Sequence, residues 1–196
     1  MKRILFIGNS YTFFHDMPKS LFAPMLREAG VECEVTAVTR GGYYLSQFAD
    51  PENEEGKRLR KTVEGKQYDC VILQDQSCNP VKNEERFLQG VKALKALLEE
   101  QTAHFVLYST WGRKEGSPQL AEMHLTSEEM TERLHLAYHR AADTFGMRVA
   151  DVGLAFAKER TESPEIELYD PDLSHPSLEG SRLAARVICD AVMAEI

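Results

Sequence analysis

The stretch Ile4-Leu5-Phe6-Ile7-Gly8-Asn9-Ser10, close to the N-terminus, decides the fold class. Its four consecutive apolar residues predict a short strand that is buried on both faces. Gly8-Asn9-Ser10 then places a hydroxyl group directly after the strand. Similar apolar runs recur along the chain and predict further strands at residues 33–38, 70–73, 105–108 and 149–152.

The longer segments between these runs have the apolar spacing of amphipathic helices. Helices are predicted at residues 21–29, 84–100, 126–145 and 177–195. Gly30 is a stop signal for the first helix, and Thr126 with Glu129 forms a capping box that opens the third. Because strands and helices alternate, we expect an α/β fold with a mostly parallel sheet of about five strands and helices on both faces. The 196 residues fit a single domain, 1–196.

Composition excludes several classes of function. A net charge of −8 argues against non-specific nucleic-acid binding, which needs a basic surface. The four cysteines form no C-x-x-C pair, and Cys33, Cys70 and Cys189 lie in apolar segments, so we expect buried free thiols in a reducing compartment. The first apolar run is too short for a signal peptide or a membrane span, which predicts a cytoplasmic location without membrane association.

A second motif, Asp172-Leu173-Ser174-His175-Pro176, precedes the last predicted helix. In a parallel sheet the ligand lies beyond the carboxyl ends of the strands, and Ser10 lies at such an end. Taken alone, Ser10 is as well explained as a helix cap and the second motif as a turn. Together they supply the nucleophile, base and orienting carboxylate of a triad, and they predict a serine hydrolase with Ser10, His175 and Asp172 in these roles.

Other motifs of α/β proteins are missing after the first strand. The nucleophile elbow G-x-S-x-G does not match, because Thr12 stands where its second glycine belongs. Neither G-x-G-x-x-G nor the phosphate-binding G-x-x-x-x-G-K-[ST] is present there. A mononucleotide-binding protein of flavodoxin type is therefore a weak alternative.

At these residues the chain resembles the SGNH, or GDSL-type, hydrolases, a family of esterases, lipases and deacetylases. The resemblance spans nearly the whole chain and implies a flavodoxin-like three-layer α/β/α sandwich. Gly8-Asn9-Ser10 stands where the family has Gly-Asp-Ser, which makes Ser10 the implied nucleophile and its N–H an oxyanion donor. Gly42 resembles the glycine that gives a second donor, and Asp172 with His175 matches the family's D-x-x-H block.

Two departures mark a divergent branch of this family. Asn9 replaces the usual Asp, which removes a charge beside the nucleophile. Gln74-Asp75-Gln76-Ser77 replaces the block Gly-x-Asn-Asp, so that Gln76 would supply the third oxyanion donor through its side-chain amide. The extra methylene of Gln76 shifts this donor, and the backbone has to compensate.

We further expect a substrate pocket formed by Asn9, Gly41, Tyr43 and Trp111, although core packing explains Trp111 equally well. The polar stretch 112–125 is long for a connection and is a candidate lid. His135 and His139 are expected to face solvent or to pack, not to bind metal.

The expected function is the hydrolysis of a small acyl ester, with an acetyl group on a carbohydrate as the favoured substrate. No metal and no organic cofactor are expected. A non-catalytic binding module that retains the fold is the main alternative, because the Gln74 to Ser77 block departs from the family pattern.

Overall fold

The computed structural model describes residues 1–196 and contains one sheet of five parallel strands. The strands are β1 (Lys2–Gly8), β2 (Cys33–Thr39), β3 (Tyr68–Leu73), β4 (Thr102–Ser109) and β5 (Arg148–Asp151). Their order across the sheet is β2-β1-β3-β4-β5, which is the flavodoxin-like order. The predicted α/β fold with about five strands is confirmed.

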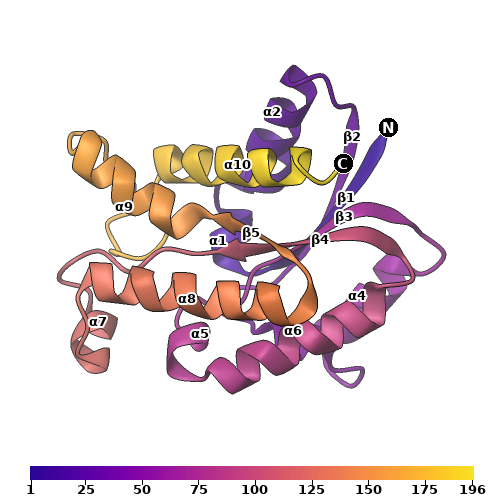
Figure 1. Cartoon of the computed structure of the whole chain (residues 1–196), viewed down its shortest axis with the longest axis horizontal. Helices are drawn as coiled ribbons and strands as arrows, with labels where there is room; N and C mark the ends of the chain where they lie inside the picture. The colour runs from indigo at the N-terminus through magenta and orange to yellow at the C-terminus, as the bar shows by residue number, and fades with distance from the viewer.

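Helices cover both faces of the sheet and produce three layers (Figure 1). One face is covered by η2 (Met17–Phe22), α2 (Ala23–Glu28), α9 (Val152–Glu162) and α10 (Leu178–Met193). The other face is covered by α3 (Leu45–Ala49), α4 (Glu54–Val63), α6 (Glu84–Leu98) and α8 (Ser127–Phe145). Short helices lie in the connections: α1 (Ser10–Phe13), η1 (Phe14–Asp16), α5 (Asn79–Lys82) and α7 (Pro118–Met123).

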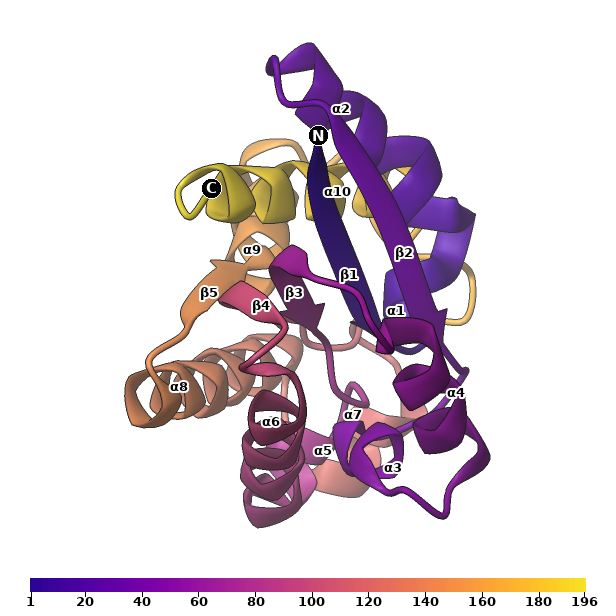
Figure 2. The same cartoon turned by 90° about the vertical axis from the view of Figure 1, so that its right-hand side faces the viewer.

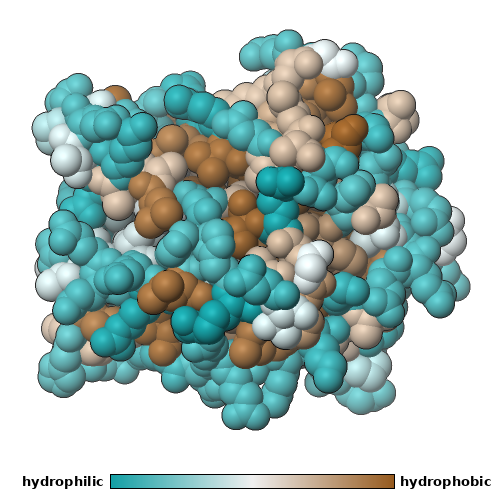
Figure 3. Space-filling model, in the orientation of Figure 1, coloured by the Kyte–Doolittle hydropathy of each residue, from teal (hydrophilic) through white to brown (hydrophobic).

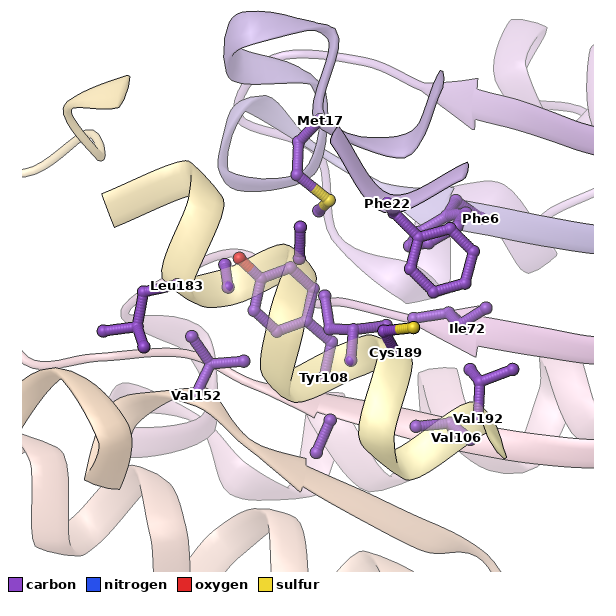
Figure 4. Packing of buried hydrophobic residues seen from close by; sticks show 14 of the residues in the cluster. Phe6, Met17, Phe22, Ile72, Val106, Tyr108, Val152, Leu183, Cys189 and Val192 are labelled. Carbon is purple, nitrogen blue, oxygen red and sulfur yellow. The ribbon is translucent and has the colours of Figure 1, made fainter. Parts of the chain in front are cut away.

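Strand β1 shows why the first apolar run has no polar face. Ile4 and Phe6 point into the core on one side of the sheet, and Leu5 and Ile7 point into the core on the other; all four are fully buried. Burying such a side chain contributes about 1.5–3 kcal/mol. Figure 4 shows the first of these cores, where side chains from the sheet and from α10 surround Tyr108.

The helix boundaries follow the predictions where caps are present and differ where they are not. Thr126 caps α8 through the expected capping box with Glu129. The helix predicted at 21–29 is in fact the π-helix η2 followed by α2, and it ends before Gly30, whose φ is +87°. Helix α9 was not predicted, because it buries few residues and therefore has no apolar stripe.

The strands direct their carboxyl ends toward one rim of the molecule. Figure 2 shows β1 and β2 side by side, with α1 and α3 beyond their carboxyl ends. The chain leaves β1 toward β2 on one side and returns to β3 on the other, so β1 lies at the topological switch point of the sheet. Ligands of open parallel sheets bind at this place.

The surface on the face shown in Figure 3 is largely hydrophilic, with hydrophobic residues between the polar ones. No helix combines the length and the apolar character that crossing a bilayer requires. The four cysteines are free and buried, as expected for Cys33, Cys70 and Cys189.

Candidate active site

Ser10 lies directly beyond β1, as the first residue of α1. The preceding Asn9 is the N-cap of this helix, and its Oδ1 accepts a hydrogen bond from the N–H of Tyr11 at 3.2 Å. The Asn9 side-chain amide also donates to the backbone oxygen of Tyr43 at 3.1 Å. An ionised Asp has no proton to donate, so Asn at this position links the loops that follow β1 and β2.

Gln74 fastens the Ser10 loop to the neighbouring strand β3. Its Oε1 accepts hydrogen bonds from the Asn9 N–H and from Thr12 Oγ1, both at 2.9 Å. These groups also explain why position 8 is a glycine, because a Cβ there would lie 2.4 Å from Thr12 Oγ1 and 2.8 Å from Gln74 Oε1. No sequence pattern predicts this role of Gln74, since the contact depends on the pairing of β1 with β3.

Ser10, His175 and Asp172 lie in one hydrogen-bonded line. His175 Nε2 is 2.8 Å from Ser10 Oγ, and His175 Nδ1 is 2.5 Å from Asp172 Oδ2. Because an ionised carboxylate only accepts, Nδ1 carries a proton and Nε2 is left to accept the proton of the hydroxyl. A serine hydroxyl that donates to an imidazole in this way can lose its proton as it attacks.

The Asp172 side chain also organises the loop that carries His175. Its Oδ1 accepts from the N–H groups of Ser174 and His175 at 3.0 and 2.9 Å. Partial burial alone would raise the pKa of Asp172, but hydrogen bonds from His175 and these two N–H groups outweigh it and keep the pKa below its ordinary value. Asp172 is therefore ionised at neutral pH.

Aromatic rings hold the imidazole in place. Phe14 stacks on His175 with ring centroids 4.2 Å apart and planes 6° apart, and Tyr11 meets His175 edge-on at 5.6 Å. Such contacts restrict rotation of the imidazole ring. Sequence reasoning missed Phe14, for which the only signal was an aromatic residue one helical turn after Ser10.

Trp111 does not line the cavity that contains Ser10, in contrast to the pocket expected from the sequence. Its ring is fully buried and stacks between Tyr11 and Phe156, at 4.6 and 4.0 Å. Its Nε1–H donates to the backbone oxygen of Ser174 at 3.1 Å. The indole thus has a polar partner inside the core and supports the loop of His175 from below the site.

Three groups with N–H donors line the same cavity as the Ser10 hydroxyl: Ser10 itself, Gly42 and Gln76. Gly42 has a φ of +74°, a backbone conformation that favours glycine. The Oε1 of Gln76 accepts from the N–H of Cys78 at 2.8 Å. The three residues follow β1, β2 and β3, the strands that meet at the switch point.

Asp75 connects the loops that carry Gly42 and Gln76. Its carboxylate is fully buried and accepts from the N–H groups of Leu45 and Gln76, both at 2.8 Å, and from the Asn79 amide at 2.6 Å. Burial raises the pKa of Asp75 to about 6, against the effect of these donors. The sequence places Asp75 in the right block but gives no sign of this bridging role.

The cavity has a volume of about 350 Å³, at the small end of ligand pockets. Its lining is almost entirely polar and consists of Asn9, Ser10, Tyr11, Gly42, Gln76, Ser77, Arg113, Gln119, Asp172, Ser174 and His175. A larger and more open depression of about 790 Å³ lies along α6, α8 and the β4–β5 edge and contains none of these residues. Only the smaller cavity contains the hydrogen-bonded pair of Ser10 and His175.

Two further residues expected in the substrate pocket do not line this cavity. Gly41 is exposed and does not line the cavity, because the turn directs only Gly42 toward it. The Tyr43 ring packs against Phe48 at 5.6 Å and joins the core below α3, which withdraws it from the cavity. Of the expected pocket residues, Asn9 alone lines the cavity.

The stretch 112–125 contains α7 and contributes Arg113 and Gln119 to the lining. It is fastened at several points: the Gly112 N–H donates to Thr131 Oγ1 at 3.0 Å, and the Lys114 N–H donates to the Leu173 oxygen at 3.0 Å. Sequence reasoning missed Arg113 and Gln119, since neither belongs to a motif.

His135, His139 and His15 do not line the cavity. His135 and His139 both pair with Asp151, at 2.8 and 3.0 Å, and the three donor atoms lie close enough for one metal ion to bridge them. His15 Nδ1 contacts Ser181 Oγ at 2.9 Å on the α10 side. None of these groups reaches Ser10.

Comparison with known proteins bears on the fold and the family of this chain. No family model matches the sequence, and no curated protein matches it. Among solved structures, a protein from Slackia heliotrinireducens assigned to the SGNH hydrolases is 31% identical, with a TM-score of 0.83 over 97% of this chain and 98% of that chain.

Two more distant structures share the fold. A DUF4886 family protein from Bacteroides uniformis is 17% identical, with a TM-score of 0.79 over 98% of this chain and 83% of that chain. Axe2, an acetylxylan esterase from Geobacillus stearothermophilus, is 15% identical, with a TM-score of 0.69 over 97% of this chain and 94% of that chain. With a relative of 31% identity that matches it from end to end, the chain belongs to the SGNH hydrolases, a family of ester-hydrolysing enzymes.

Proposed function

We propose that this chain is a serine esterase that hydrolyses small acyl esters, with Ser10 as nucleophile, His175 as general base and Asp172 as the carboxylate that orients His175. The observation that carries the proposal is the unbroken hydrogen-bonded line from Ser10 Oγ through both ring nitrogens of His175 to Asp172. Such a line activates a hydroxyl that is otherwise a weak nucleophile.

The reaction proceeds through an acyl-enzyme. Ser10 Oγ attacks the ester carbonyl while its proton passes to His175 Nε2, and His175 then returns the proton to the leaving alcohol. Water then attacks the acyl carbon while it gives a proton to His175, and His175 returns this proton to Ser10 Oγ as the acid leaves. Asp172 stays ionised throughout and stabilises the imidazolium that forms in each half-reaction.

The negative charge that develops on the carbonyl oxygen is stabilised by the N–H groups of Ser10 and Gly42 and by the side-chain amide of Gln76. All three residues line the cavity that contains the nucleophile. Removing one donor of this kind costs about 3–4 kcal/mol of transition-state stabilisation.

The lining of the cavity supports a proposal for the substrate class. Tyr11 is the only hydrophobic residue among the eleven that form the cavity, so a long acyl chain would find few apolar side chains to pack against. A short acyl group, above all acetyl, and a polar alcohol such as a carbohydrate fit a small polar cavity better. The acetylxylan esterase with the same fold supports this choice by analogy.

The test is hydrolysis of p-nitrophenyl acetate, p-nitrophenyl butyrate and acetylated sugars by the wild type and by Ser10→Ala. We expect acetate to be preferred and Ser10→Ala to lose roughly 10⁴-fold or more in kcat. Ser20→Ala is a matched control, because Ser20 contacts Asp16 on the surface, outside the cavity. Absence of turnover together with absence of labelling by a fluorophosphonate would favour a non-catalytic binding module instead.

A further inference from the structure

Arg113 brings a positive charge to the active-site cavity without a counter-ion from the protein. Its terminal nitrogens contact Ser174 Oγ, Ser77 Oγ at 2.9 Å and Cys78 Sγ at 3.8 Å, and none of these partners is a carboxylate. Its Nε is buried and has no hydrogen-bond partner. None of the fifteen ion pairs in the protein includes Arg113.

This arrangement is costly, since a partly buried guanidinium loses hydration that neutral hydroxyls replace only in part. The chain contains 31 Asp and Glu residues that could supply a counter-ion. The neighbouring Lys114, by contrast, is paired with Glu167 on the surface. The one acid in the cavity, Asp172, is engaged by His175 and by two backbone N–H groups.

Arg113 also lies close to the chemistry. Its guanidinium shares Ser174 Oγ with the hydroxyl of Tyr11, and Ser174 directly precedes His175. Arg113, Ser10 and His175 line one cavity of about 350 Å³. A ligand group bound by Arg113 would therefore be part of the same small molecule as the ester that Ser10 attacks.

We propose that Arg113 binds a carboxylate of the substrate, so that the enzyme prefers acyl esters of carboxylated alcohols, such as sugar acids, over neutral ones. This inference rests on the proposed esterase function and names its substrate class. A carboxylate in the cavity supplies charged acceptor oxygens to a guanidinium whose terminal nitrogens have only two hydroxyls and a thiol as partners. A single negative charge suits the cavity better than a dianion, because Asp172 also lines it and would repel a second charge.

The experiment compares two acetyl esters that differ in one group. 4-Acetoxybenzoate carries a carboxylate, and 4-acetoxybenzamide carries a neutral amide of similar shape. We expect the wild type to prefer the benzoate in kcat/KM by about tenfold or more, as a charge-assisted hydrogen bond implies. Arg113→Met should bring the ratio close to one, and Arg113→Lys should restore part of it. Lys114→Met removes the same charge one residue away and should leave the ratio at its wild-type value.

The outcomes separate the two proposals. In one outcome the wild type hydrolyses both esters at similar kcat/KM and Ser10→Ala abolishes both activities. This outcome overturns the inference about Arg113 but supports the proposed esterase function. Equal losses on both esters in Arg113→Met also overturn it, because Arg113 would then only connect the Ser77 and Ser174 loops. Faster hydrolysis of 4-acetoxyphenyl phosphate than of the benzoate rejects the carboxylate in favour of a phosphate. Failure to hydrolyse either ester tells against the esterase itself.

Discussion

The side-chain Oε1 of Gln76 accepts a hydrogen bond from the backbone N–H of Cys78 at 2.8 Å. Because a backbone N–H can only donate, this contact fixes which end of the amide is the oxygen. The NH₂ end has no partner within the protein and belongs to a residue that lines the cavity of Ser10. The extra methylene of Gln, compared with Asn, is thus accommodated by folding the side chain back onto its own loop.

Gln76→Ala is expected to lower kcat by about 10² to 10³-fold, as the loss of one oxyanion donor does. KM for p-nitrophenyl acetate should change little, because the donor acts mainly on the transition state. Gln119→Ala, which removes another side-chain amide from the cavity lining, is the comparison. If both variants lose kcat equally, Gln76 has no special part in stabilising the oxyanion.

Gly42 and Gly41 form a natural pair of test positions. A Cβ at Gly42 meets no atom within 4 Å, yet its φ of +74° strains any other residue. Gly42→Ala should therefore turn the backbone N–H away from its present direction and lower kcat by about tenfold or more. Gly41→Ala, where the nearest atom is 3.9 Å away and φ is ordinary, should retain wild-type kinetics. Equal kinetics of the two variants would remove Gly42 from the proposed oxyanion hole.

Trp111 should matter for stability and not for substrate binding. Trp111→Phe keeps an aromatic ring between Tyr11 and Phe156 but leaves the backbone oxygen of Ser174 without its donor. We expect a loss of about 1–3 kcal/mol in the free energy of unfolding, measured by urea denaturation. A large rise in KM with unchanged stability would return Trp111 to the substrate pocket.

The fold could be predicted from the sequence because its signals are local. The apolar run of Ile4 to Ile7 and the capping box at Thr126 specify β1 and the start of α8 through neighbouring residues alone. The two motifs around Ser10 and His175 were equally visible, since each is a short stretch. The two motifs are joined by the 2.8 Å contact between Ser10 Oγ and His175 Nε2, which lie 165 positions apart in the sequence. This contact follows only from the packing of α10 and the loop before it.

The residues that sequence reasoning missed act through tertiary contacts. Gln74 reaches the Ser10 loop because β3 pairs with β1, and Asp75 joins two loops because α3 starts beside it. Trp111 was misassigned for a related reason: a residue after a strand can point to the rim or to the core. No pattern in the neighbouring residues distinguishes these two directions.

Asp172→Asn should leave the loop geometry largely intact, since an amide oxygen still accepts from the backbone N–H groups of Ser174 and His175. It removes the charge that stabilises the imidazolium and favours the wrong tautomer of His175. We expect kcat to fall on the order of 10³ to 10⁴-fold. Asp170→Asn is the control, because Asp170 contacts this loop only through its backbone. A loss below tenfold would mean that His175 acts without a carboxylate partner.

Asp75 gives the chain a pH dependence of stability that has an unusual sign. Its pKa rises to about 6 in the folded protein, so between pH 4 and 6 the folded state holds a proton that the unfolded state has released. Stability contributed by this proton is present below pH 4 and falls as the pH rises to about 6, by about 3 kcal/mol. Asp172 has a pKa below its ordinary value, so its effect on stability falls at lower pH and has the opposite sign.

Asp75→Asn removes this titration, so the difference in unfolding free energy between wild type and variant should change between pH 4 and 6 and be constant from pH 6.5 to 8. Urea denaturation at half-unit pH intervals measures it. Asp143→Asn, at an exposed position on α8, should show no such change. A difference that is flat across the whole range would show that the buried Asp75 carboxylate is ionised in both states. The three donors around it would then outweigh its burial.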